Sequence, residues 1–258
     1  DSYFSLLIIL LSFFNGYSQQ LGLSNLYGTN LQSINPAFSS ISDYDAAFLN
    51  HRSQWSEVDN SPVTSFISGN YSINKSNGIG ANVYLENIGL IRQLYALSSY
   101  SHSVRIKNHR FSLGLGLGIH QQSISLNEVI AEDYTDDILT NNTNSGFTLL
   151  TELGGMYNFK NITLGFSSPR IFETKIKSTS FGLERQQIGF ASYNIKYNDK
   201  INVIPSALYK FVTLENSQYD FNLDLDLNRQ FLIGVGYRSN NSILLGANAH
   251  LKDRIDVG

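Results

Sequence analysis

An alternation of apolar and polar residues that runs through nearly the whole chain constrains its fold more than any other feature. From about Tyr44 to Leu251, segments of about 8–14 residues follow this period-2 pattern. Clusters of Asn, Gly, Ser, Asp and Lys separate the segments. Helical periodicity is nowhere sustained, and no segment after the N-terminal stretch has the roughly twenty consecutive apolar residues that a membrane-spanning helix needs. The sequence therefore predicts an all-β chain.

Three segments, at 111–122, 219–227 and 231–238, show the alternation most clearly. One face of each is apolar and suits lipid: Phe111, Leu113, Leu115, Leu117 and Ile119; Tyr219, Phe221, Leu223, Leu225 and Leu227; and Phe231, Ile233, Val235 and Tyr237. The opposite faces carry glycine and polar residues, and we expect Asp220, Asp224, Asp226 and Arg238 to face a lumen. Membrane barrels have this pattern because one face meets hydrocarbon while all backbone groups bond between strands.

A soluble β-sandwich also alternates, so the membrane interpretation needs further support. The chain has 15 Tyr and 16 Phe, and these gather at the ends of the expected strands. Residues 3–14 are apolar and uncharged, as in the core of a signal peptide. We therefore predict a transmembrane antiparallel up-and-down β-barrel of the outer membrane.

The N-terminal residues divide into two expected parts ahead of the barrel. Gly16 and Ser18 occupy the small-residue positions of a cleavage site, which makes 1–18 a signal peptide whose basic start is missing. The alternative for this stretch is a buried strand or helix. Residues 19–42 are expected to form an N-terminal periplasmic segment, and residues 43–258 the barrel.

The connections between the expected strands fall into two classes. The even-numbered ones are short, at 74–77, 107–109, 159–160, 198–200 and 228–229, whereas the odd-numbered ones include long loops at 126–145 and 168–182. Barrels of this kind have short periplasmic turns and longer external loops. About 12 strands are visible, and because residues 255–258 begin another, we expect about 14 in the complete chain, its C-terminal strands being absent here.

Several kinds of function find no support in the sequence. A net charge of −3 gives no basic field for nucleic acid, and the absence of Cys excludes thiolate metal sites. The five histidines are scattered, so nothing indicates a metal, a cofactor or an enzyme. The glycines at 114, 116 and 118 alternate within one strand and lack the helix of a phosphate-binding loop. They let the sheet curve or another backbone approach closely.

Charged and aromatic residues outside this pattern each allow two interpretations. The acidic residues at 132–137 could bind calcium or form a solvated loop. Asp220, Asp224 and Asp226 could line a cation path, but we favour pairing with Arg and Lys. Trp55 is an interfacial anchor or a partner contact. The short turns carry basic residues that either solvate the rim or bind a partner: Lys75, Lys107, Lys160, Lys200 and Arg229.

Short motifs spread along the chain resemble those of the PorP/SprF family, outer-membrane proteins of the type IX secretion and gliding machinery of the Bacteroidota. The resemblance runs from about Asn35 to the last residue and includes Trp55 in the Arg-Ser-Gln-Trp sequence that closes the first expected strand. The other motifs are Asn35-Pro36-Ala37, Ser61-Pro62-Val63-Thr64, Gly78-Ile79-Gly80, Gly89-Leu90-Ile91-Arg92, 111–116, 165–170, Pro205-Ser206 and Gly236-Tyr237-Arg238.

This resemblance implies a role in protein secretion or in retaining secreted proteins at the cell surface. It implies two kinds of partner, a periplasmic ring of the machinery and the C-terminal domain of exported proteins. The alternative function is a passive outer-membrane pore or small-solute transporter. In either case we expect no catalytic residues, no cofactor and no nucleic-acid partner.

Overall fold

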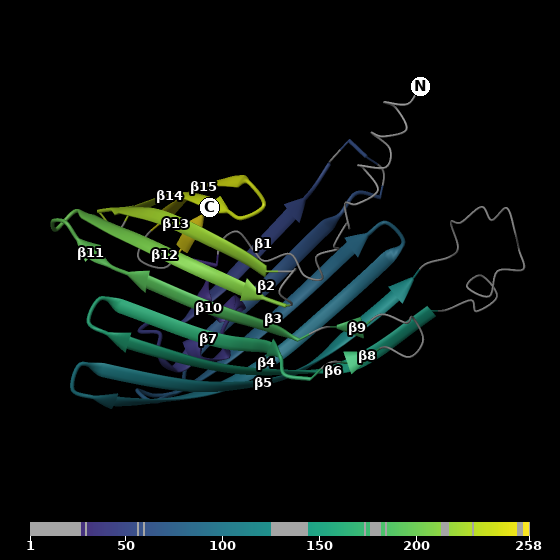
Figure 1. The fold of residues 1–258 in the computed structure, drawn as a ribbon, viewed down its shortest axis with the longest axis horizontal. Coiled ribbons are helices and arrows are strands. Elements are labelled where there is room, and N and C mark those ends of the chain that lie inside the picture. Colours follow the sequence, from purple (N-terminus) through teal and green to yellow (C-terminus); the bar gives the residue numbers. More distant parts are fainter. Residues whose placement is uncertain are drawn as a thin grey trace, which may run out of the picture.

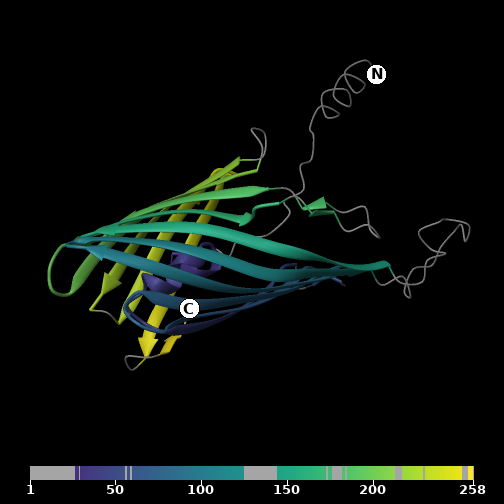
Figure 2. The same cartoon turned by 90° about the horizontal axis from the view of Figure 1, so that it is seen from below.

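The chain forms one strongly curved antiparallel sheet in a computed structural model (Figures 1 and 2). The structure describes residues 27–28, 30–55, 57–58, 60–124, 144–172, 174–175, 182–183, 185–212, 217–228, 230–251 and 255–257. Among these residues, no helix is long and apolar enough to cross a membrane. The expected signal peptide at 1–18 lies outside the described residues.

The strands follow one another around the sheet in chain order, each pairing with the next. They are β1 (Ala46–Ser53), β2 (Val63–Ser72), β3 (Asn77–Ile88), β4 (Ile91–Ile106), β5 (His109–Ile124), β6 (Asn144–Phe159), β7 (Ile162–Arg170), β10 (Gln186–Tyr193), β12 (Ile201–Phe211), β13 (Ser217–Leu227), β14 (Phe231–Arg238), β15 (Ser242–Leu251) and β16 (Ile255–Val257). Short β8 (Thr174–Lys175) and β9 (Gly182–Leu183) pair with each other, and β11 (Ile195–Lys196) pairs with β12.

This architecture confirms the predicted up-and-down antiparallel fold. The alternation sets the side-chain directions as expected: on β5 the outward Leu113, Leu115 and Leu117 are 71%, 61% and 71% exposed, whereas Gly114 and Gly116 lie on the inner face. The same holds on β13, where Phe221 is 56% exposed and Asp220 is fully buried. The strand expected to start near residue 255 is β16.

The two ends of the sheet differ as predicted. We call the end with the connections β2–β3, β4–β5, β6–β7, β10–β12 and β13–β14 the short-turn end, and the opposite end the loop end. Two of the short turns, at 107–108 and 160–161, have two residues. Their first residues, Lys107 and Lys160, have φ angles of 55° and 53°, as the tight turns that match strand twist require.

Strand length varies around the sheet. β4, β5 and β6 each have 16 residues, whereas β10 and β14 have 8. A membrane crossing takes about 9–11 residues of tilted strand. The long strands therefore continue beyond the others, which Figure 1 shows on the side of the loop end.

The N-terminal segment lies inside the curve of the sheet. It contains two short 3-10 helices, η1 (Leu31–Ser33) and η2 (Pro36–Ser40), drawn in purple in Figure 2. Every residue from Pro36 to Ser42 is buried. Residues 19–42 were expected to lie ahead of the barrel, in the periplasm. The structure instead packs residues 30–42 against the inner face, because their polar groups find partners there.

Candidate functional site

Residues 30–42 fill part of the space enclosed by the sheet, and we call them the plug. Two small apolar clusters hold the plug and the preceding Tyr27 in place. In one, Tyr27 and Ile34 pack on Ile188, Phe190 and Leu208 of β10 and β12. In the other, the plug residues Ala37, Phe38 and Ile41 pack on Met156 of β6. These clusters are small for a segment of this length, so hydrogen bonds must contribute much of the attachment.

Polar side chains of the plug bond across to several strands. Asn30 donates to the Ser68 hydroxyl at 2.7 Å, and Gln32 donates to the Ser99 hydroxyl at 3.1 Å. Each joins a buried residue of the plug to a buried residue of the wall. Buried polar groups persist in folded proteins when they are bonded, so these residues fix the position of the plug.

Asn35 is the most extensively bonded residue of the plug. Its side-chain oxygen accepts from the Ala37 amide at 2.9 Å and so caps η2, whose first residue is Pro36. Its side-chain nitrogen donates to the carbonyls of Gly155 on β6 and Phe166 on β7, both at 3.1 Å. One side chain therefore starts the helix and attaches it to two strands.

Glycines on the inner face allow the plug to approach the sheet. A Cβ atom at Gly114 would lie 2.6 Å from the Pro36 carbonyl oxygen, and one at Gly78 would lie 2.6 Å from the Ser40 amide. At Gly154 it would lie 2.7 Å from the Pro36 ring. Real Cβ contacts are not this short, so these positions cannot carry a side chain unless the plug moves. The close approach inferred from the alternating glycines is present.

Arg110 of β5 holds the C-terminal end of the plug. Its guanidinium donates to the carbonyls of Ser40 and Ile41, at 2.5 and 3.0 Å, and pairs with Asp43 at 3.0 Å. The Arg110 side chain is 10% exposed and that of Asp43 is 86% exposed. The backbone carbonyls of Ser40 and Ile41 are therefore the main buried partners of Arg110. After these residues the chain continues into β1, which starts at Ala46.

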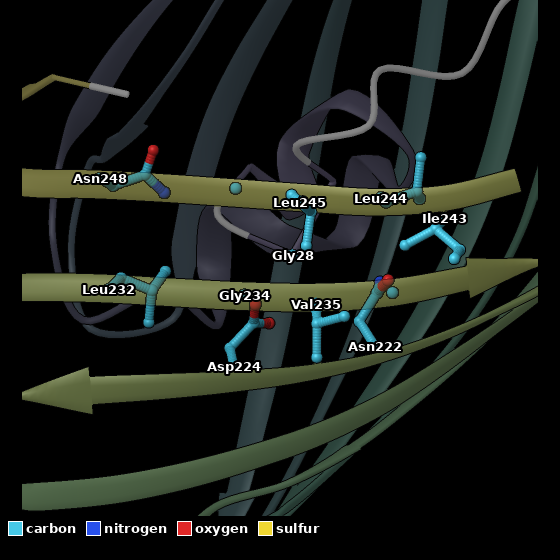
Figure 3. A pocket seen from close by; sticks show the side chains of 12 residues that line it. Gly28, Asn222, Asp224, Leu232, Gly234, Val235, Ile243, Leu244, Leu245 and Asn248 are labelled. Atoms are coloured by element: carbon cyan, nitrogen blue, oxygen red, sulfur yellow. The ribbon is translucent and has the colours of Figure 1, made fainter.

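The predicted lumen-facing residues lie on the inner face of β13 and β14, away from the strands β3–β6 that hold η2 of the plug. Asp220 is fully buried and pairs with Arg238 at 2.8 Å, the pairing that the sequence favoured for this acidic stripe. Asp226 accepts from Asn202 at 3.1 Å. Asp224 forms no ion pair among the described residues and borders a cavity of about 270 Å³ between β13, β14, β15 and Gly28 (Figure 3). The plug does not fill this side.

The predicted partner-binding residues are distributed over both ends of the sheet. Lys75, Lys107, Lys160 and Lys200 are exposed at the short-turn end, where the Lys160 amine lies 5.3 Å above the Phe159 ring. Trp55 lies at the loop end, two residues after β1, and is 71% exposed. Arg229 and the acidic residues at 132–137 lie outside the described residues.

Histidine and acidic residues do not assemble a metal centre within the part of the chain that the structure describes. His120 is buried and stacks in parallel on Tyr95, with ring centroids 4.0 Å apart. His109 stacks on Phe159 and bonds to the Tyr157 hydroxyl. Both rings take part in packing on the strand faces.

Sequence reasoning missed the plug itself. It placed residues 19–42 ahead of the barrel, as an N-terminal periplasmic segment. Two signals were available: the glycines and serines in alternate positions on β3, β4 and β5, and the cap sequence Asn35-Pro36. Neither says which segment of the chain approaches the small residues.

Comparison with known proteins gives one family and one fold. A family model described as "Type IX secretion system membrane protein PorP/SprF" matches residues 15–258. Among solved structures, the CymD monoaromatic hydrocarbon channel is similar with a TM-score of 0.54 and 10% identity over 92% of this chain and 87% of the channel. This identity supports likeness of fold alone. No curated protein sequence matches the chain.

Proposed function

Because the chain belongs to the PorP/SprF family of type IX secretion system membrane proteins, we propose that it is an outer-membrane barrel that docks secreted proteins. The loop end faces outside and binds the C-terminal domain of an exported protein. The short-turn end faces the periplasm and contacts a ring of the secretion machinery. The barrel thus retains its cargo at the cell surface and catalyses no reaction.

The plug is the observation that carries this proposal. It occupies the space against β3–β6 and is attached to β2, β4, β5, β6 and β7 by side-chain hydrogen bonds. A segment held there narrows the path for free diffusion through the barrel. In a barrel used as a platform, the plug stiffens the wall and leaves the two ends as binding surfaces.

The short-turn end suits an acidic partner. Its five described lysines, at positions 75, 107, 160, 196 and 200, are exposed, and two of them, Lys107 and Lys160, have left-handed backbones. Asn, Asp or Gly adopts that conformation at lower cost than Lys. The presence of lysine in both turns, despite this cost, supports a need for positive charge at the short-turn end. Asp199 offsets part of this charge but already pairs with Lys196.

Charge reversal tests the ring contact. Replacing Lys75, Lys160 and Lys200 together by Glu should weaken association with the purified ring at low ionic strength, and added salt should reduce the difference because screening acts over about 8–10 Å. Reversing Arg52, Arg92 and Arg185, which belong to the loop end, is the matched control. Equal ring binding by parent and lysine variant would place the contact elsewhere.

A single aromatic substitution at each end tests cargo docking. Trp55→Ala at the loop end should reduce co-purification of an exported C-terminal domain, since exposed tryptophans often anchor interfaces. Tyr197→Ala removes a 76% exposed aromatic residue after β11, at the short-turn end, and should leave capture unchanged. Loss of capture in both variants, or in neither, would contradict docking at the loop end.

The cavity beside Gly28 favours one second candidate, a small-solute pore. The barrel reconstituted in vesicles should show little solute flux if it is a docking platform. Rapid flux of small solutes in the absence of any partner would favour the pore.

A further inference from the structure

A second cavity, of about 60 Å³, lies beside Ser33 of the plug. Its lining is mainly apolar and aromatic, and Tyr84, Tyr95, Leu97 and Leu150 pack together there. About 10–15 Å³ of such space holds one water molecule. The cavity therefore has room for a small polar group on a short stem.

The aromatic wall is part of a continuous row across four strands. Phe66 stacks on Tyr84 with centroids 4.1 Å apart, Tyr84 meets Tyr95 edge to face, and Tyr95 stacks on His120. These residues are directly opposed neighbours in the ladders β2–β3, β3–β4 and β4–β5. Cross-strand packing of this kind fixes the ring positions, so the cavity wall is preformed.

Glu152 of β6 is the acidic side chain in this cavity. It is 7% exposed and forms no hydrogen bond or ion pair with the residues that the structure describes. Its cross-strand neighbour is Gly116, where a Cβ atom would lie 2.9 Å from a carboxyl oxygen of Glu152. The glycine therefore gives the carboxyl group its space. A buried carboxylate without a partner is costly, so a cationic ligand would stabilise its charged form.

We propose that this cavity binds an organic ammonium group on a short apolar stem, with Glu152 as the counter-ion. The carboxylate accepts from the ammonium, the face of a tyrosine ring attracts the same charge, and Leu97 and Leu150 contact the stem. Ammonium fits better than a metal ion, since no group of three acidic or histidine side chains surrounds Glu152 among the described residues.

The basic residue of the cavity sets the direction of the ligand. Arg170 donates to Gln186 at 2.7 Å, so its guanidinium is held at the β7–β10 side of the cavity. A cationic ligand avoids that side and approaches Glu152 on β6. This inference does not depend on the docking role, because binding of a small ammonium ion can be measured on the barrel alone.

The test is calorimetric titration of the purified full chain in detergent with n-butylammonium, n-butanol and sodium butyrate. Butylammonium should bind best. Glu152→Gln keeps the shape and removes the charge, and should weaken butylammonium binding by about tenfold or more. Glu86→Gln is the matched control: Glu86 also lies on the inner face but already accepts from Thr64 at 3.3 Å, so butylammonium affinity should not change.

A second variant covers the case in which Glu152→Gln fails to fold. Gly116→Ala should displace the Glu152 carboxyl group and also weaken butylammonium binding. The inference is overturned if the parent does not bind butylammonium, if Glu152→Gln binds it equally well, or if butyrate binds more tightly than butylammonium.

Discussion

Two regions of the inner face, on β3–β6 and on β13–β15, differ in where their polar groups find partners. Against the plug, on β3–β6, the inward positions are mostly Gly and Ser, and the partner groups come from the plug. On β13–β15 the inward positions include Asp220, Asp224 and Arg238, which pair with one another or border a cavity. The first region is a docking surface for the chain itself, whereas the second supplies its own polar partners.

Glycine has a different meaning in each region. At Gly114 an added Cβ would meet the plug backbone, whereas at Gly246 it would meet nothing within 4 Å. At Gly236 it would meet the side chain of Asn222, its cross-strand neighbour. An alternating glycine therefore makes room for another segment at Gly114, makes room for a cross-strand side chain at Gly236, and borders open space at Gly246.

The largest effect is expected from Asp220→Ala, which breaks the second region. It leaves the Arg238 guanidinium without its carboxylate in a buried position, and the free energy of unfolding should fall by about 3–5 kcal/mol. Urea titration in lipid vesicles measures it. Asp199→Ala, which removes an exposed ion pair with Lys196, is the control and should change little. Equal effects would mean that the lumen hydrates Asp220 fully.

Substitutions on the outer face should affect both regions alike. Leu115→Arg on β5 and Leu225→Arg on β13 each place a charge towards lipid, at a cost of about 2–4 kcal/mol near the midplane. Assembly is followed by the heat-dependent mobility of the folded barrel on gels. A variant that assembles as well as the parent would show that its strand does not face lipid at that position.

Gly114→Ala should destabilise the first region by about 1–3 kcal/mol, because the plug must shift to accept the methyl group. The matched change Gly246→Ala, in the second region, should stay within about 0.5 kcal/mol of the parent. Urea titration compares the two. If both variants unfold at the same urea concentration, close approach of the plug does not limit the size of residue 114.

The smallest effect is expected from Ser103→Ala. The Ser103 hydroxyl donates to the Ser40 carbonyl at 2.9 Å, and its loss should cost about 1 kcal/mol. Ser98→Ala on the outer face of the same strand is the control and should be nearly neutral. A neutral Ser103→Ala would show that water replaces this bond and that the plug is held mainly by Arg110 and Asn35.

The sequence predicted the wall of the barrel well and its contents poorly. Local patterns predict the outward direction of Leu115 and Leu225 and the short turns at Lys107 and Lys160. They also predict the strand that starts at residue 255. They do not predict the burial of Arg110, nor the lack of a partner for Glu152 among the described residues, because each depends on residues far away in the chain. Arg110, for example, bonds to carbonyls about seventy positions earlier.

The sequence by itself determined which residues face outward, because alternation repeats every two residues and one face of a membrane barrel must be apolar. It also determined the order of the strands, since consecutive strands of an up-and-down sheet pair with each other. Only the tertiary structure decided what fills the lumen. The plug has no strand or helix periodicity, and its polar residues bond to groups that come together only when the sheet curves around them.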